Sequence, residues 1–80
     1  MKYKVGDILY YRNSIKKNFL RNEPRQYRII NVGKTRYECL IVDEYVNKYN
    51  KQYFEHIHKI SEEYYISRDE LKEENPEYFL

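Results

Sequence analysis

Apolar segments in this sequence are short, and their length limits the possible folds more than any other feature. No run of apolar and aromatic residues exceeds four, as in ILYY at 8–11 and CLIV at 39–42. A membrane-spanning helix needs about 20 such residues in succession. Short β-branched and aromatic runs between polar breaks are typical of strands. The pattern therefore predicts a small, mainly β protein without a transmembrane segment.

Five segments have the residue types of strands. They are residues 4–12, 26–32, 36–43, 52–60 and 64–66. Residues 33–35, Gly-Lys-Thr, separate the second segment from the third, which predicts a hairpin. In the third segment both alternating sets of side chains are largely apolar, so this strand is expected in the middle of the sheet. Residues 13–24 and 44–51 are expected to be loops.

A capping box marks the start of one helix. In ISRDEL at 66–71, the Ser67 side chain can accept a hydrogen bond from the backbone N–H of Glu70. The Glu70 carboxylate can in turn accept one from the Ser67 N–H. Pro76 prevents the helix from continuing past the preceding residue. The sequence therefore predicts a two-turn helix at about 68–74.

Tyrosine is the main bulky residue, with eleven copies in 80 residues and no tryptophan. A chain this short hides only about 60% of the surface that it exposes when unfolded. Each tyrosine ring can bury roughly 150 to 250 Å² if its hydroxyl reaches water or a partner. We therefore expect tyrosine rings to help close a modest core, although a bulge in the fourth strand would reverse half of its side chains. The expected core residues are Val5, Ile8, Tyr10, Ile30, Val32, Cys39, Ile41, Ile57, Ile60, Ile66 and Leu71.

The order of these elements resembles that of small bacterial and phage proteins with SH3-like barrels. It comprises a strand, a long loop, a hairpin, two further strands and a short helical turn, and it opens with VGD. The resemblance covers about residues 4–67. It implies a single domain over 1–80, with a five-stranded barrel, a helix at about 68–74 and an apolar tail at 76–80. ILYYR stands where signalling SH3 domains have an ALYDY-like stretch, and their paired tryptophan is absent, so proline-rich peptide recognition is not implied.

Charge is divided unevenly along the chain. Residues 1–36 carry ten Lys or Arg against two acids, a net charge of +8. Residues 37–80 carry five against eleven, a net charge of −6. Such a division marks either two faces with different partners or two halves that attract one another within the fold.

The acidic C-terminal region is a candidate partner-binding face. Residues 61–77 hold seven carboxylates, the last of them on Glu77. They could dock on a basic cleft of a nucleic-acid enzyme, in place of phosphates. Alternatively, they belong to a solubilising helix that pairs with the basic half of the chain. The apolar chain end either anchors a partner or covers the core. The candidate residues are Glu62, Glu63, Asp69, Glu70, Glu73, Glu74, Tyr78 and Phe79.

A basic segment is the candidate for a second function, the binding of RNA or single-stranded DNA. Cations neutralise phosphates, and aromatic rings can stack on unpaired bases. The plainer interpretation is a solvated loop. The candidate cations are Arg12, Lys16, Lys17, Arg21, Arg25 and Arg28, and the aromatic residues interleaved with them are Tyr11, Phe19 and Tyr27.

No arrangement of residues in the sequence predicts catalysis or a cofactor. A Gly-rich phosphate loop and a G-x-S-x-G motif are both absent. His56 and His58 share one face of a strand, but structural zinc takes four ligands, so no metal is expected. Cys39 is the single cysteine, which excludes an intrachain disulfide and favours the cytoplasm.

We therefore expect a non-enzymatic binding module that acts on another protein, as a monomer or a small homo-oligomer. In general character, the chain resembles the accessory proteins of phages and mobile elements, including anti-CRISPR proteins. That resemblance implies an inhibitor of a host nucleic-acid-handling or defence protein, with no membrane involved. The alternative is an SH3-like domain that binds nucleic acid directly.

Overall fold

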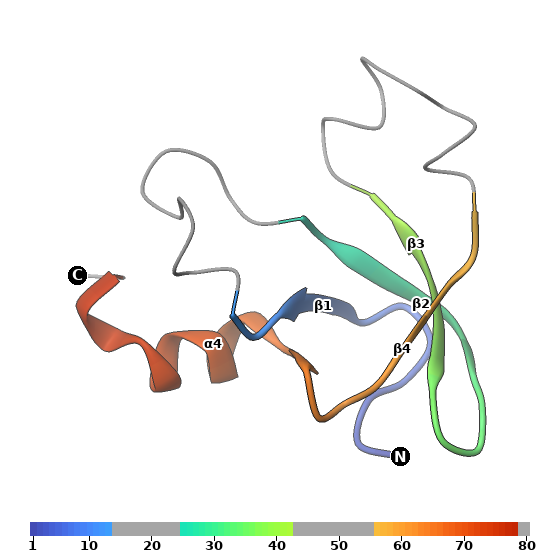
Figure 1. The fold of residues 1–80 in the computed structure, drawn as a ribbon, viewed down its shortest axis with the longest axis horizontal. Coiled ribbons are helices and arrows are strands. Elements are labelled where there is room, and N and C mark those ends of the chain that lie inside the picture. The colour runs from blue at the N-terminus through green and yellow to red at the C-terminus, as the bar shows by residue number, and fades with distance from the viewer. Residues whose placement is uncertain (14–24, 43–55, 79–80) are drawn as a thin grey trace.

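The computed structural model describes residues 1–13, 25–42 and 56–78. Five antiparallel strands form a curled half-barrel, and one short helix follows them (Figure 1), which confirms the mainly β fold class. The sheet order is β4-β3-β2-β1-β5. The elements are β1 (Ile8–Tyr11), β2 (Tyr27–Val32), β3 (Tyr37–Ile41), β4 (His58–Ile60), β5 (Tyr65–Ile66), α4 (Arg68–Glu74) and the 3₁₀ turn η1 (Pro76–Tyr78).

The first strand begins later than expected, because residues 4–7 form a turn. The Asp7 N–H donates to the Lys4 carbonyl at 3.0 Å, and the Lys4 N–H donates to Asp7 Oδ2 at the same distance. Gly6 occupies the left-handed region at φ 96°, where residues with a side chain are strained. Val5 lies in this turn and is 61% exposed, so the expectation that it is a core residue is wrong.

The predicted hairpin is formed by β2 and β3. Val32 pairs with Tyr37, and the Gly33 N–H donates to the Arg36 carbonyl at 2.9 Å to close the turn. A Cβ on Gly33 would lie 2.9 Å from that carbonyl oxygen, so the turn requires glycine.

A bulge in β2 decides which isoleucine enters the core. Ile29 pairs with Cys39, but the next pair along the two strands joins Asn31 to Glu38. Ile30 is the extra residue at this irregularity, where the alternation of faces is interrupted. Ile29 is buried, whereas Ile30 is 38% exposed. The prediction of Ile30 as a core residue is therefore wrong, and this bulge lies in β2 instead of the fourth strand.

The fourth strand is shorter than predicted within the part that the structure describes. Residues 52–55 lie outside that part, and β4 begins at His58. Because His58 pairs with the core-facing Cys39, strand alternation directs the preceding Ile57 away from the core. Ile57 is 55% exposed, which contradicts its expected place in the core.

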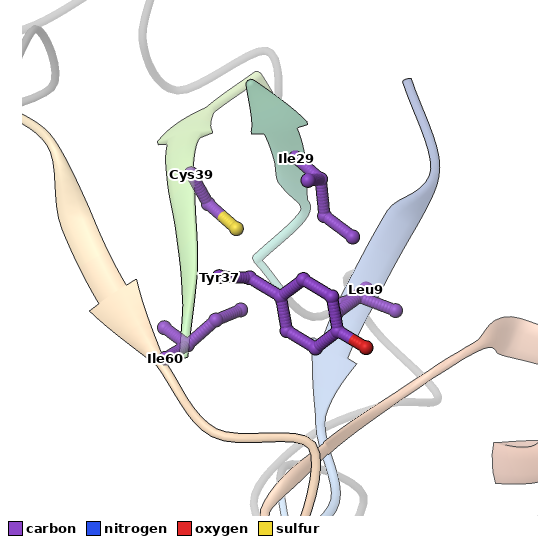
Figure 2. Close-up of a cluster of buried hydrophobic side chains, with 5 residues drawn as sticks. All are labelled: Leu9, Ile29, Tyr37, Cys39 and Ile60. Atoms are coloured by element: carbon purple, nitrogen blue, oxygen red, sulfur yellow. The ribbon is translucent and has the colours of Figure 1, made fainter. Parts of the chain in front are cut away.

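β1 separates two apolar clusters. Figure 2 shows the larger cluster, in which side chains from four strands meet inside the curl of the sheet. Ile8 and Tyr10 point to the opposite face of β1, where Tyr10 packs with Ile66 and with Leu71 of α4. α4 therefore covers the outer face of β1, and the inner face of β1 packs against the larger cluster through Leu9. The larger cluster consists of Leu9, Ile29, Tyr37, Cys39 and Ile60.

Strand register explains which core predictions are confirmed. The expected core residues that are buried are Tyr10, Cys39, Ile41, Ile60, Ile66 and Leu71. Ile8 and Val32 are only half-buried. Leu9, Ile29 and Tyr37 are core residues that the expected set omits. Their inward direction follows from the pairing of β1, β2 and β3, which sequence alternation within a single strand does not supply.

The capping box of α4 is present as predicted. The Glu70 N–H donates to Ser67 Oγ at 3.2 Å, and the Ser67 N–H donates to Glu70 Oε1 at 3.4 Å. Asn75 is the C-cap, and Pro76 begins η1. Within the described ranges, no helix is long and apolar enough to cross a membrane.

Candidate functional site

The Glu62 carboxylate is held by β3 and by the N-terminal segment. The Tyr37 hydroxyl donates a hydrogen bond to Glu62 Oε2 at 2.6 Å, and the backbone N–H of Lys2 donates to the same oxygen at 3.2 Å. The hydrogen bond from Tyr37 is the main cause that lowers the pKa of Glu62. Burial raises the pKa of Tyr37, which therefore keeps its proton as the donor. Glu62 thus has a structural role within the fold.

Glu70 joins the N-terminal segment to the start of α4. Its Oε1 atom accepts hydrogen bonds from the Tyr3 hydroxyl and, at 2.9 Å, from Ser67 Oγ, while Oε2 forms an ion pair with Lys2 Nζ. Burial acts to raise the pKa of Glu70, but the hydrogen bonds from Lys2, Tyr3 and Ser67 outweigh it and lower this pKa to about 2. A second acid of the predicted partner-binding face is therefore engaged within the fold.

Arg12 links the two predicted faces to each other. Its Nε atom lies 3.1 Å from Glu74 Oε1, and its Nη1 donates to the carbonyl oxygen of Glu63. Both charged side chains are partly exposed, so the ion pair is worth only about 0 to 1 kcal/mol. The contact nevertheless joins a candidate for nucleic-acid binding to a candidate for partner binding.

Three further carboxylates remain exposed along the C-terminal elements, and we call them the acidic row. Asp69 and Glu73 are four residues apart on α4, so they lie on one face of the helix, and Glu77 follows after four more residues in η1. Glu63 is also exposed. Glu62 and Glu74 are exposed as well, but their carboxylates are bonded to Tyr37 and to Arg12, so the acidic row and Glu63 are the remaining exposed acids of the predicted face.

Only part of the predicted basic face lies in the described residues. Arg25 is half-buried just before β2, and Arg28 is exposed within β2. Lys16, Lys17, Phe19 and Arg21 lie outside the described residues, as does Phe79 of the predicted partner-binding face. Tyr78, the other aromatic residue predicted there, is the last residue of η1.

Other exposed cations lie near the hairpin, and no sequence pattern had singled them out. Lys34 and Arg36 flank the tip of the β2–β3 turn, and Lys59 lies in β4 opposite Glu38. Figure 1 shows the hairpin turn at the opposite side of the molecule from α4. These cations therefore lie away from α4, whereas Lys2 and Arg12 of the basic half lie against it.

Four rings form an aromatic row at one end of the curled sheet. The ring centroids of Tyr11 and Tyr65 are 5.4 Å apart, those of Tyr65 and Tyr27 are 5.1 Å apart, and those of Tyr27 and His58 are 5.8 Å apart. Tyr27 belongs to β2, whereas His58 and Tyr65 belong to β4 and β5, which are not its neighbours in the sheet. The curl brings these rings together, so sequence reasoning identified Tyr11 and Tyr27 in the basic segment but not their contact with Tyr65 and His58.

The electrostatic surroundings of the aromatic row are cationic at one end. Burial, the charge of Arg25 and that of His56 lower the pKa of His58. Burial is also the main cause that raises the pKa of Tyr65 to about 12, so its hydroxyl stays protonated. The row therefore has an uncharged Tyr65, and the positive charge of Arg25 acts on its His58 end.

The described residues offer no arrangement typical of a metal site or of thiol chemistry. No group of three or more His, Cys, Asp or Glu side chains in this part of the chain is placed to hold a metal ion. Cys39 is buried in the larger cluster, and burial raises the pKa of its thiol to about 11. Comparison with protein-family models, with curated protein sequences and with solved structures finds no match to this chain.

Proposed function

We propose that this protein is a non-enzymatic binding module that uses the acidic row to contact a basic surface of another protein. The observation that carries this proposal is the exposure of Asp69, Glu73 and Glu77 at intervals of four residues. Three neighbouring acids, Glu62, Glu70 and Glu74, are held within the fold, so the row is a distinct subset of the acidic region.

The acidic row is unfavourable for the isolated chain. Like charges four residues apart on a helix repel and cost about 0.2 to 0.5 kcal/mol per pair. Glu73 also lies near the C-terminal end of α4, where the helix dipole disfavours a negative charge. A basic partner surface would relieve both effects, and this gain would add to the affinity of the complex.

The support beneath the helix suits a binding surface. The capping box fixes the start of α4, Leu71 buries its inner face, and Lys2 and Arg12 tie it to distant parts of the chain. The acidic row is therefore presented on an element whose position is set by packing. Little ordering would be needed when a partner binds, which favours affinity.

The partner class that we propose is a host protein that handles nucleic acid, such as a defence enzyme, with the acidic row occupying the basic channel where phosphates would lie. This is the mode expected of an anti-CRISPR-like inhibitor encoded by a phage or mobile element and acting in the cytoplasm. The proposal combines the charge of the row with the general character of the sequence.

Capture from a cell lysate tests the proposal when it is combined with neutralised variants. The triple variant Asp69→Asn, Glu73→Gln, Glu77→Gln should fold, because its positions are exposed and its changes relieve repulsion. It should lose at least about tenfold in affinity for the partner that the wild-type protein captures. Heparin, a polyanion, should displace the wild-type protein from that partner.

A matched control removes three charges at the opposite side of the molecule. The variant Lys34→Gln, Arg36→Gln, Lys59→Gln should keep the affinity for the captured partner within about threefold, because a distant rim charge contributes little. Equal retention of the partner by both triple variants would refute the acidic row as the contact surface.

A further inference from the structure

A second surface has a different chemistry from the acidic row and lies at the end of the sheet where β1 stops and where β2 and β4 start. Antiparallel pairing places Tyr11, Tyr27 and His58 at this end, since each is a terminal residue of its strand. Tyr65, the first residue of β5, pairs with Tyr11. Four strands thus each contribute one ring to the aromatic row.

The aromatic row is only partly used by the core. Tyr27 and Tyr65 pack against the larger cluster while keeping part of their surface exposed, and Tyr11 is 40% exposed. The centroids of successive rings in the row are 5.1 to 5.8 Å apart, so the rings contact one another and their relative positions are fixed. The aromatic row is therefore an ordered surface of partly exposed rings on which a flat ligand can stack. Its side chains lose little conformational freedom when such a ligand binds.

The positive charge of Arg25 favours anionic ligands among those that could stack on the aromatic row. Arg25 is close enough to His58 to act on it electrostatically, and Arg25 precedes β2 by two residues. A peptide with basic or neutral residues gains nothing from this cation, whereas a phosphate does. Aromatic rings that stack on bases, with a cation for the backbone, form the usual platform for single-stranded nucleic acid.

We propose that Tyr11, Tyr65, Tyr27 and His58, together with Arg25, form a binding site for unpaired nucleobases of a single-stranded nucleic acid. Tyr11 takes a base on its exposed surface, and Arg25 contacts a phosphate near the other end of the row. The site does not depend on the acidic row, which lies on the C-terminal elements. A base-paired duplex binds weakly, because its bases are stacked on one another and are not available to the rings.

A labelled oligonucleotide tests the site directly. The probe is a fluorescein-labelled oligothymidylate of about 12 nucleotides, compared with the same strand annealed to its complement. Fluorescence anisotropy should show binding of the single strand at about 50 mM salt, weaker binding at about 200 mM salt, and little binding of the duplex. Failure of the wild-type protein to bind the single strand at the lower salt concentration would overturn the proposal.

Two variants of the row have a matched control in an exposed tyrosine outside it. Tyr11→Ala and Arg25→Gln should each weaken binding by at least about fivefold, because each removes one base or phosphate contact. Tyr64→Ala should leave binding within about twofold, since Tyr64 is 51% exposed but does not belong to the aromatic row. Equal effects of Tyr11→Ala and Tyr64→Ala would contradict the assignment.

The absence of tryptophan from the chain provides a readout that does not depend on affinity. Tyr11→Trp keeps a stacking ring and adds a single indole fluorophore. Base stacking should change its emission on titration with the oligothymidylate, and an unchanged emission at saturation would place the nucleic acid elsewhere. The neutralised acidic-row variant should bind the oligonucleotide at least as well as the wild-type protein, so the two proposals fail independently.

Discussion

The hydroxyl of Tyr37 accepts a hydrogen bond from the backbone N–H of Tyr3 at 2.9 Å and donates one to Glu62 Oε2 at 2.6 Å. The ring beneath this hydroxyl is fully buried in the larger apolar cluster. One side chain therefore fills the core and also ties the N-terminal segment to the turn before β5. Figure 2 shows the ring between Leu9 and Ile60, with its oxygen directed away from Cys39.

Tyr37→Phe should lower the free energy of unfolding by about 1 to 3 kcal/mol, because the Tyr3 N–H loses its acceptor while the ring still fills the core. Urea denaturation measures this change. Tyr64→Phe is the matched control at an exposed position and should stay within about 0.5 kcal/mol of the wild-type protein. Equal stability of the two variants would show that the Tyr37 hydroxyl does not stabilise the fold.

The β2 bulge predicts opposite results for two adjacent isoleucines. Ile29→Ala should destabilise the protein by about 2 to 5 kcal/mol, because Ile29 is fully buried. Ile30→Ala should cost less than about 1 kcal/mol, since its side chain is partly exposed on the other face. Chemical denaturation of both variants tests the register, and the reverse order of stabilities would place the bulge elsewhere.

Ser67→Ala should lower stability by about 1 kcal/mol through loss of the N-cap. Thermal unfolding followed by circular dichroism measures the effect, and Ser67→Thr should recover much of it because threonine keeps a hydroxyl that can cap the helix and donate to Glu70. An unchanged melting temperature in Ser67→Ala would contradict the capping box as a source of stability.

Acid should weaken the attachment of the N-terminal segment to α4. The pKa of Glu70 falls from 4.5 to about 2 on folding, so its stabilising effect is fully present above pH 4.5 and is lost as the pH falls toward 2. Glu62, whose pKa is also lowered, contributes in the same direction. Urea denaturation between pH 7 and pH 2 should show this loss.

A variant without the Glu70 charge is the control for this pH dependence. Glu70→Gln should be less stable than the wild-type protein near pH 7, because it removes the ion pair with Lys2. The difference between the two proteins should shrink toward pH 2, where Glu70 becomes protonated. A difference in stability that stays constant over this pH range would show that the lowered pKa of Glu70 does not stabilise the fold.

Cys39 should be unreactive in the native protein. Its burial and its pKa of about 11 leave little accessible thiolate at pH 8. Alkylation by iodoacetamide at that pH should be at least about 100-fold slower than in urea, as followed by mass spectrometry. Similar rates in both conditions would contradict the burial of Cys39 inside the curl.

Helix ends and turns that depend on a few neighbouring residues were predicted from the sequence. The capping residue Ser67, the stop at Pro76 and the turn at Gly33 each act through neighbouring backbone groups, so their positions are visible without tertiary structure. The candidate acids were found for the same reason, as a run of charges. Which of them are engaged by other parts of the chain was not visible, since Lys2 bonds to both Glu62 and Glu70 and Tyr37 bonds to Glu62, and all of these contacts join residues far apart in the sequence.

Short apolar runs, turn residues and a capping box act over a few residues, so they were sufficient to predict a small mainly β chain with one capped C-terminal helix. The burial of Ile29 rather than Ile30, and the row formed by Tyr11, Tyr65, Tyr27 and His58, could be seen only in the folded protein. Both outcomes depend on strand register and on the curl of the sheet. These are set by contacts between residues far apart in the chain, and a local pattern does not encode them.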